Sequence, residues 1–389
     1  KTMPSVLNLS CTPIPLVHIA LIGLGSRGMK TLERYSYIKG AEIRYIADLS
    51  YERLILANQK LEESGRARAT ILQGEDAWLH ACERNDVDLV YICTEWKSHT
   101  TIAIEAMRHG KHVAVEVPAA TTIAECHELV KTAETTQRHL FMTENCCYDY
   151  FALETLEMHK QGLFGEITHC EGAYIHNLAQ AVSTNNPHND THTNWMTHSC
   201  ATHGGNPYPT HGIGPIAQLL GFHREDYMER LVSITSRGSQ SNGEDPVGRI
   251  NTALIQTHKG VSILLQLDVT TPRPYSRIQT ICGTKAYAQK YPIPTLQFDN
   301  TTTLTGPKAE EKLKEFATSN SAILWIEGHK MGVANEMNYA MDARLIQCLQ
   351  KGLPLDIDAY DAAEWSSLAE LTRISAEQGG KIVDIPRFI

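Results

Sequence analysis

A glycine-rich turn near the start of the chain constrains its fold more than any other feature. The apolar run VHIALIG, which begins at Val17, has the length and β-branched content of a buried strand. It leads into GLGSRG, which places Gly23, Gly25 and Gly28 in G-x-G-x-x-G spacing before a helical stretch. The first glycine permits a tight turn, the second lets backbone approach a pyrophosphate, and the third permits close helix–strand packing. A strand before the motif and a helix after it are typical of a dinucleotide-binding unit.

The second predicted strand, AEIRYIADLS, indicates which dinucleotide binds. It ends at Asp48, twenty residues after Gly28. An acid at this place bonds the hydroxyls of the adenosine ribose and repels a 2′-phosphate, which favours NAD over NADP. The structural alternative is that Asp48 caps the helix predicted for YERLILANQKLEES. Ser26 and Arg27, inside the glycine turn, are predicted to contact the cofactor as well.

Strands and helices continue to alternate as far as about residue 150, which predicts a doubly wound parallel sheet, the Rossmann arrangement. Ligands of such sheets bind beyond the carboxyl ends of the strands. Polar and aromatic residues that directly follow strands should therefore lie at the cofactor edge. They are Thr94, Trp96, His99, Glu116 and Asn145, with Glu144 and Pro118 at the same edge.

The pattern changes after Tyr150. A helix, a strand and a further helix from Gly214 to Leu220 precede a run of antiparallel-looking strands, and two helices close the chain. The sequence predicts an α/β protein with a Rossmann domain over residues 15–148. An α+β domain follows over residues 149–389, with a large open, mostly antiparallel sheet and C-terminal helices that can pack back on the first domain. The open sheet face predicts a homo-oligomer. Residues 300–321 are the best candidate for a mobile insertion.

Composition excludes several classes of partner. The formal net charge of the 389 residues is -9 and no basic run occurs, so nucleic acid is excluded as a partner. No apolar stretch is long enough to span a membrane. The ten cysteines are scattered without any CxxC, which argues against structural zinc and a disulfide framework. The chain begins KTMPSV, so its compartment stays open: cytoplasmic, or exported after removal of a signal segment.

A histidine-rich segment before YPTHGIGP allows two interpretations. Its imidazoles and carboxylate could bind a metal through the following residues: His188, Asp190, His192, His198 and His203. An H-x-x-x-H pair usually binds zinc from a helix, whereas STNNPHNDTHTNW has the composition of a loop. We therefore predict a polar loop that faces substrate or solvent, and no metal.

Several long stretches together identify a family. They are GKHVAVEVPAA, TENCCYDY, GLFGEITHCEGAYIHNL, YPTHGIGP and DVTTPRPYSR. Over almost its full length the chain resembles the Gfo/Idh/MocA oxidoreductases, and within them glycoside hydrolase family 109, the NAD-dependent glycosidases typified by α-N-acetylgalactosaminidase. The oxidoreductases usually carry E-K-P, with the Lys as proton donor at the carbinol. Here the stretch is Glu116-Val117-Pro118, which is the pattern of the glycosidase branch.

The resemblance implies a catalytic cycle without net redox change. NAD takes hydride from C3 of the sugar, the C2 proton is removed, the C1 substituent is eliminated, water adds and the hydride returns. By resemblance, His211 handles the proton of the C3 hydroxyl, since its ordinary pKa lies near neutrality, and Tyr174 takes the C2 proton. Glu144, Tyr208 and Tyr275 are implied to bind the sugar.

The substrate expected from this resemblance is an N-acetylhexosamine or a related glycoside. Related glycosidases hold the sugar with an Arg directly after the residue that corresponds to Trp195, and this chain has Met196 there. One alternative is an NAD(P)-dependent sugar or polyol dehydrogenase, which would release NADH. Another is a nucleotide-binding module that has lost catalysis.

Overall fold

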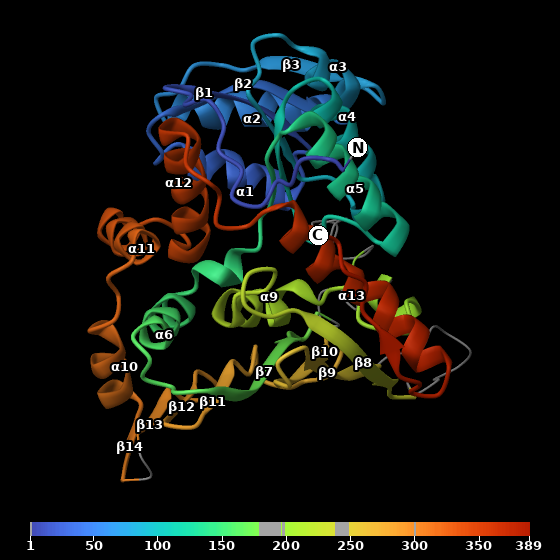
Figure 1. Ribbon diagram of the computed structural model, residues 1–389. Helices are drawn as coiled ribbons and strands as arrows, with labels where there is room; N and C mark the ends of the chain where they lie inside the picture. The colour runs from blue at the N-terminus through green and yellow to red at the C-terminus, as the bar shows by residue number, and fades with distance from the viewer. Residues whose placement is uncertain (1, 179–195, 197–198, 238–248, 299–300) are drawn as a thin grey trace. The chain divides into compact units, whose positions relative to one another are not determined.

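The computed structural model describes residues 2–178, 196, 199–237, 249–298 and 301–389 (Figure 1). The chain forms two compact units. The first comprises Lys1–Thr143, Leu324–Glu364 and Phe388–Ile389, and the second comprises Glu144–Ile323 and Trp365–Arg387. The first break thus falls between Thr143 and Glu144, where the sequence suggested 148 and 149, and a C-terminal segment returns to the first unit.

The first unit is built on a six-stranded parallel sheet in the order β3-β2-β1-β4-β5-β6. Its strands are β1 (Val17–Ile22), β2 (Ala41–Asp48), β3 (Thr70–Gln73), β4 (Leu89–Ile92), β5 (His112–Val115) and β6 (Leu140–Met142). Its helices are α1 (Ser26–Tyr35), α2 (Tyr51–Glu63), α3 (Ala77–Glu83), η1 (Trp96–Ser98), α4 (His99–Arg108), α5 (Ile123–Thr136) and α12 (Glu336–Lys351). Every residue of β4 and β5 is buried, as a parallel sheet covered on both faces requires. The strand order reverses between β1 and β4, the switch point at which doubly wound sheets bind ligands.

A buried carboxylate ties α12 into the first unit. Asp342 is fully buried, and its Oδ2 accepts a hydrogen bond of 2.6 Å from the Arg34 guanidinium. Its Oδ1 accepts hydroxyl hydrogen bonds of 2.9 Å from both Tyr35 and Tyr91. The charge of Asp342 is therefore paired and hydrogen-bonded, which a buried ion needs. This contact explains why a helix so late in the chain belongs to the first unit.

The second unit contains a nine-stranded sheet in the order β14-β13-β12-β11-β7-β10-β9-β8-β15. Its strands are β7 (Ile167–Ile175), β8 (Met228–Thr235), β9 (Ile250–Thr257), β10 (Ser262–Asp268), β11 (Thr280–Gly283), β12 (Ala286–Gln289), β13 (Thr295–Phe298), β14 (Thr302–Thr305) and β15 (Val383–Asp384). Its helices are η2 (Asn145–Tyr148), α6 (Tyr150–Lys160), α9 (Thr210–Leu220) and α10 (Pro307–Lys314), while α11 (Asn320–Met331) and α13 (Ala359–Glu377) have residues in both units. Strands β7 and β10 pair in parallel, and the other described pairs are antiparallel. The predicted fold class is therefore confirmed.

The two faces of this sheet differ in exposure. Along β9, Ala253 and Ile255 are buried, whereas Leu254 between them is 50% exposed. Ile234 on the adjacent strand β8 is 68% exposed. One face therefore carries the core, with α9 against β7, and the other is open in the single chain, as predicted from the alternating strands (Figure 1).

One local prediction was wrong. Helix α9 begins at Thr210 instead of Gly214, because glycines at helix positions next to the sheet let the helix continue where they were interpreted as loop punctuation. The stretch predicted to be a mobile insertion contains β14 and α10. Pro307 begins α10 at a position that suits proline, and Ala309 and Leu313 on the inner side of α10 are buried.

Candidate active site

The centre of the candidate site is a buried ion pair between His211 and Glu144. His211 lies in the first turn of α9, and Glu144 follows β6 and precedes η2. The two side chains are 5% and 0% exposed, and His211 Nδ1 lies 2.6 Å from Glu144 Oε1. Burial disfavours both charges, but the mutual attraction prevails and lowers the pKa of Glu144. Burial likewise opposes the imidazolium, yet the neighbouring Cys146 and Glu144 raise the pKa of His211.

This ion pair involves two residues whose roles the sequence predicts. The sequence argument started from an ordinary histidine pKa near neutrality, whereas in the structure Cys146 and Glu144 outweigh burial and raise the pKa of His211, which favours its imidazolium form. Glu144, expected to bind sugar hydroxyls, directs one carboxylate oxygen at His211 and at the backbone N–H of Cys146, 3.0 Å away. Glu144 therefore orients the histidine in this structure, and its carboxylate favours the protonated ring.

Two predicted tyrosines surround the histidine ring. The ring centroids of Tyr174 and Tyr208 lie 5.1 and 4.7 Å from that of His211, and 5.0 Å from each other. Tyr174 comes from β7 and Tyr208 from the segment before α9. The structure thus brings together His211, Tyr174, Tyr208 and Glu144, all within the second unit.

A second histidine, which the sequence analysis missed, contacts Tyr174. The Tyr174 hydroxyl lies 2.9 Å from Nδ1 of His176. Burial, and then the positive charge of His211, lower the pKa of His176, which favours a neutral imidazole that can accept a hydrogen bond from the Tyr174 hydroxyl. The available signal was the spacing: residues two apart on a strand face the same side, which makes His176 a neighbour of Tyr174.

Tyr275 belongs to the rim of this cluster. Its ring lies 5.3 Å from His176 and 6.4 Å from Tyr174, between ring centroids, and it is 43% exposed. Its hydroxyl accepts a hydrogen bond of 2.7 Å from Arg277, whose other terminal nitrogen donates to Asp149 at 3.1 Å. Arg277, also missed from the sequence, holds Tyr275 by a charge-assisted bond.

Small residues allow α9 to approach the sheet closely. A Cβ on Gly172 of β7 would lie 2.2 Å from the carbonyl oxygen of Gly212 in α9. A Cβ on Gly212 would lie 2.9 Å from the backbone nitrogen of Ala173, and one on Gly214 would lie 2.8 Å from Cγ of Glu144. None of these distances is compatible with a side chain. The glycines of YPTHGIGP therefore set the depth at which His211 reaches Glu144.

The glycine turn of the first unit fits a dinucleotide. Gly23 has a φ of 93°, and a Cβ on Gly28 would lie 1.8 Å from the carbonyl oxygen of Gly23, so both are required by the turn itself. A Cβ on Gly25 would meet no atom within 4 Å, which leaves the space that a pyrophosphate needs. The first turn of α1 has no side-chain cap and no acid, so its N–H groups favour an anion.

Asp48 stabilises this turn. Its carboxylate accepts backbone hydrogen bonds of 2.7 Å from Leu24 and from Ser50. Ser50, and not Asp48, caps α2, through a hydrogen bond from the backbone N–H of Arg53. The capping alternative for Asp48 is therefore wrong, and a carboxylate remains beside the glycine turn.

The other predicted cofactor residues follow strands of the first unit, except Asn145, which lies in the second. Both ring nitrogens of His99 contact backbone carbonyls, of Pro118 at 2.7 Å and Thr94 at 2.9 Å, so His99 would act on a cofactor only through the loop it holds. Thr94 Oγ1 lies 2.6 Å from Ser98 Oγ. The remaining members differ in burial: Trp96 and Asn145 are buried, and Ser26, Arg27 and Glu116 are half-buried.

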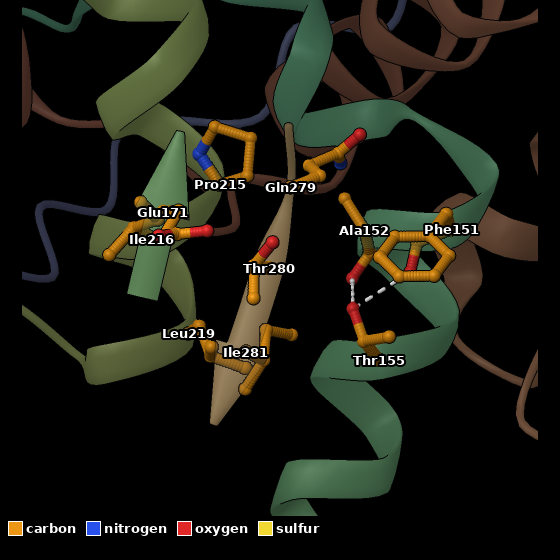
Figure 2. Close-up of a pocket in the computed structure, with 10 residues that line it drawn as sticks. All are labelled: Phe151, Ala152, Thr155, Glu171, Pro215, Ile216, Leu219, Gln279, Thr280 and Ile281. Atoms are coloured by element: carbon orange, nitrogen blue, oxygen red, sulfur yellow. Dashed lines mark hydrogen bonds between the residues drawn. The ribbon is translucent and has the colours of Figure 1, made fainter. Parts of the chain in front are cut away.

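A crevice between α6, α9 and β11 is too small for a sugar (Figure 2). Phe151, Ala152 and Thr155 form one wall, where Thr155 Oγ1 donates to the carbonyls of Phe151 and Ala152. Pro215 and Ile216 lie opposite. The cavity is about 20 Å³, room for about one water molecule. The crevice is therefore not the substrate site.

Most of the histidine-rich segment lies outside the described residues, including His188, Asp190, His192 and His198. His203 is described: its Nδ1 accepts the backbone N–H of Gly205 at 3.2 Å, and burial and Arg373 lower its pKa to about 4. Met196 is buried. In the described part of the chain, no helix is long and apolar enough to cross a bilayer.

Comparison with known proteins identifies the family. Residues 17–144 match the oxidoreductase family with an NAD-binding Rossmann fold, and residues 148–389 match the C-terminal domain of glycosyl hydrolase 109. The chain belongs to glycoside hydrolase family 109. A family 109 protein of Phocaeicola vulgatus is 47% identical over 99% of this chain and 97% of its own length. An α-N-acetylgalactosaminidase of Bacteroides fragilis is 48% identical over 98% of this chain and 94% of its own length. This family 109 chain is therefore an enzyme with an NAD-binding domain.

Solved structures agree with the fold. An NAD-binding oxidoreductase from Klebsiella pneumoniae has a TM-score of 0.71 at 15% identity and covers 96% of this chain and 100% of its own. Levoglucosan dehydrogenase with NADH and L-sorbose has a TM-score of 0.69 at 16% identity, covering 96% of this chain and 99% of its own. At these identities the likeness establishes the shared two-unit fold of the family 109 enzyme.

Proposed function

We propose that this family 109 enzyme hydrolyses an N-acetylhexosamine glycoside or a closely related one, with His211 and Tyr174 moving the protons. The α-N-acetylgalactosaminidase relative supports the substrate class. The observation that carries the assignment of roles is the His211–Glu144 ion pair enclosed by Tyr174 and Tyr208. Val117, buried where the dehydrogenases carry their lysine, supports hydrolysis over simple alcohol oxidation.

Bound NAD supplies a reversible hydride acceptor for one carbinol carbon of the sugar. His211, held by Glu144, is proposed to start from its neutral form, to take the proton of the hydroxyl on that carbon as the hydride leaves, and to return this proton at the end of the cycle. The imidazolium formed in between, which the raised pKa of His211 favours, donates a hydrogen bond to the resulting carbonyl oxygen.

Tyr174 is proposed to take the proton from the neighbouring C2 carbon. A phenol is a weak base at neutral pH, so it needs an acceptor for its own proton. His176 is neutral and hydrogen-bonded to the Tyr174 hydroxyl, and it can fill that role. Arg277 holds Tyr275 at the rim, where its hydroxyl can contact the sugar.

The test uses a panel of chromogenic α- and β-glycosides, assayed with and without added NAD⁺. We expect hydrolysis of an N-acetylhexosaminide without accumulation of free NADH. His211→Ala and Tyr174→Phe should each lower kcat by about 10²–10⁴-fold with NAD content unchanged. Tyr174→Phe should also suppress exchange of the C2 proton with deuterated solvent. Stoichiometric NADH release from a free sugar would replace this proposal with the dehydrogenase alternative.

We also infer a homo-oligomer that covers the open sheet face. Leu254 and Ile234 expose apolar side chains there on adjacent strands. Sedimentation velocity should give a mass above that of one chain, and Leu254→Lys should shift it toward the single chain. A single-chain mass for the parent protein would contradict the inference.

A further inference from the structure

Cys146 places a thiol beside the His211–Glu144 pair. Glu144, Cys146 and His211 each offer one possible ligand atom, and these three atoms lie within 4.8 Å of one another. The three side chains are 0%, 1% and 5% exposed. Carboxylate oxygen, thiolate sulfur and imidazole nitrogen are the three ligand types that zinc prefers in proteins.

The backbone holds these three side chains close together before any ion arrives. Glu144 precedes η2, Cys146 lies within η2, and the backbone N–H of Cys146 donates to Glu144 Oε1 at 3.0 Å. His211 joins them from α9, whose close approach depends on Gly214. Little conformational entropy is therefore lost when an ion binds.

A divalent ion suits the charges of these ligands. Bound to one carboxylate, one neutral imidazole and one thiolate, it leaves no net charge at the site. The buried site is therefore not required to take up an extra charge, which would be costly.

The geometry favours an inhibitory ion over a resident one. Ligands of a tetrahedral zinc ion lie roughly 3.3–3.8 Å apart, given metal–ligand bonds of about 2.0–2.3 Å. Glu144 Oε1 and His211 Nδ1 are only 2.6 Å apart, so an ion between them must replace their proton and separate them. An enzyme with this ion bound loses the ion pair on which the proposed proton transfer depends.

One other three-residue set in the described chain invites comparison: Cys11, His112 and His139. There, Nδ1 of His112 already accepts the backbone N–H of His139 at 3.1 Å. Coordination of an ion through Nε2 of His112 would require the His112 ring to lose its remaining proton. Coordination through Nδ1 would break the hydrogen bond from the backbone N–H of His139. This set is therefore the weaker site, and it provides a control.

We propose that Glu144, Cys146 and His211 form an inhibitory site for a thiophilic divalent cation such as Zn²⁺. Zinc and cadmium suit the thiolate, whereas magnesium and calcium prefer oxygen ligands and should not bind. Binding itself is independent of the reaction; only the inhibition rests on the proposed glycosidase function.

The direct test is spectroscopic, with Co²⁺ as the probe. Full-length protein carrying Cys11→Ala, which removes the weaker set, is titrated with Co²⁺. We expect one equivalent to give a thiolate-to-cobalt charge-transfer band and intense visible bands of a four-coordinate ion. Adding Cys146→Ala should abolish the charge-transfer band, while adding Cys147→Ala, the neighbouring thiol, should preserve it. Zn²⁺ should displace the cobalt.

Activity provides the second measurement, with each variant compared with its own metal-free rate. Zn²⁺ should inhibit the Cys11→Ala and Cys147→Ala proteins, and chelation should restore the rate. Cys146→Ala should raise the inhibitory concentration of Zn²⁺ by more than about 100-fold, since losing a ligand costs more than losing a residue that supports one.

The outcomes separate the two proposals. A charge-transfer band that survives Cys146→Ala, its absence from the Cys11→Ala protein, or unchanged zinc inhibition in Cys146→Ala would each overturn the metal site. A cobalt spectrum that behaves as expected in a protein without glycosidase activity would support the metal site while the proposed function fails.

Discussion

Replacing Gly172 by alanine should separate His211 from Glu144 without changing either residue. The new Cβ would lie 2.2 Å from the carbonyl oxygen of Gly212, whereas ordinary contacts begin near 3.4 Å. Because the clash is between β7 backbone and α9 backbone, no flexible side chain can absorb it. Helix α9 must therefore move away from the sheet by about 1.2 Å if it alone gives way.

That movement is large compared with the hydrogen bond that it disturbs. His211 is carried by α9 and Glu144 is not, so their separation of 2.6 Å would grow toward about 3.8 Å, beyond hydrogen-bond reach. A misplacement of about 1 Å at a reacting group costs on the order of 10²-fold in rate. Overpacking should in addition lower the free energy of unfolding by about 1–3 kcal/mol.

Gly283→Ala is the matched control. Its Cβ would lie 2.2 Å from the carbonyl oxygen of Phe164, a backbone clash of the same size in the same sheet. Both variants should lose similar stability in urea denaturation and retain NAD, but only Gly172→Ala should lose kcat, by about 100-fold. Equal kcat in the two variants, with equal loss of stability, would show that the depth of α9 does not control the site.

Two further predictions concern the first unit. Burial lowers the pKa of His112 to about 3 and that of His139 to about 4, whereas both are near 6.5 in the unfolded chain. The native state therefore binds fewer protons than the unfolded state below about pH 6.5. The free energy of unfolding should fall as the pH drops from about 6.5 to 4. The slope should be up to about 1.4 kcal/mol per pH unit for each histidine, and urea denaturation of His139→Gln should show a shallower slope than the parent. Asp48→Ala should weaken NAD binding more than NADP binding in fluorescence titrations; tighter binding of NADP than NAD by the parent protein would contradict the role of Asp48.

Sequence patterns predict those parts of the fold that are held together by contacts between residues close to each other in the chain. The strand, glycine turn and helix from Val17 to Tyr35 are contiguous, and the steric need for Gly23 and Gly28 follows from that turn alone. The place of α12 is different. Asp342 contacts Arg34 although 308 residues separate them in the sequence. Sequence periodicity does not predict which arginine a buried carboxylate will contact.

The same distinction applies to the site. Motifs placed His211, Tyr174, Tyr208 and Glu144 in one list, and the structure shows them in contact. The raised pKa of His211 could not be predicted, because it depends in part on a carboxylate 67 residues away that reaches it only after α9 packs on β7. The proximity of Cys146 to His211 could not be predicted for the same reason, since it depends on the packing of η2 against α9.

The stretch YPTHGIGP sets how closely its histidine, His211, approaches the sheet and Glu144. Pro215 lies inside α9 and has no N–H to donate to the carbonyl of His211, four residues earlier. The helix therefore lacks one of the bonds that would otherwise fix its first turn. The close contact of α9 with Gly172 and the ion pair with Glu144 help to fix the position of His211. A helix alone does not require Gly212, Gly214 and Pro215, since glycine and proline are poor helix formers. Their combination is explained by the close approach that brings His211 against the buried carboxylate of Glu144.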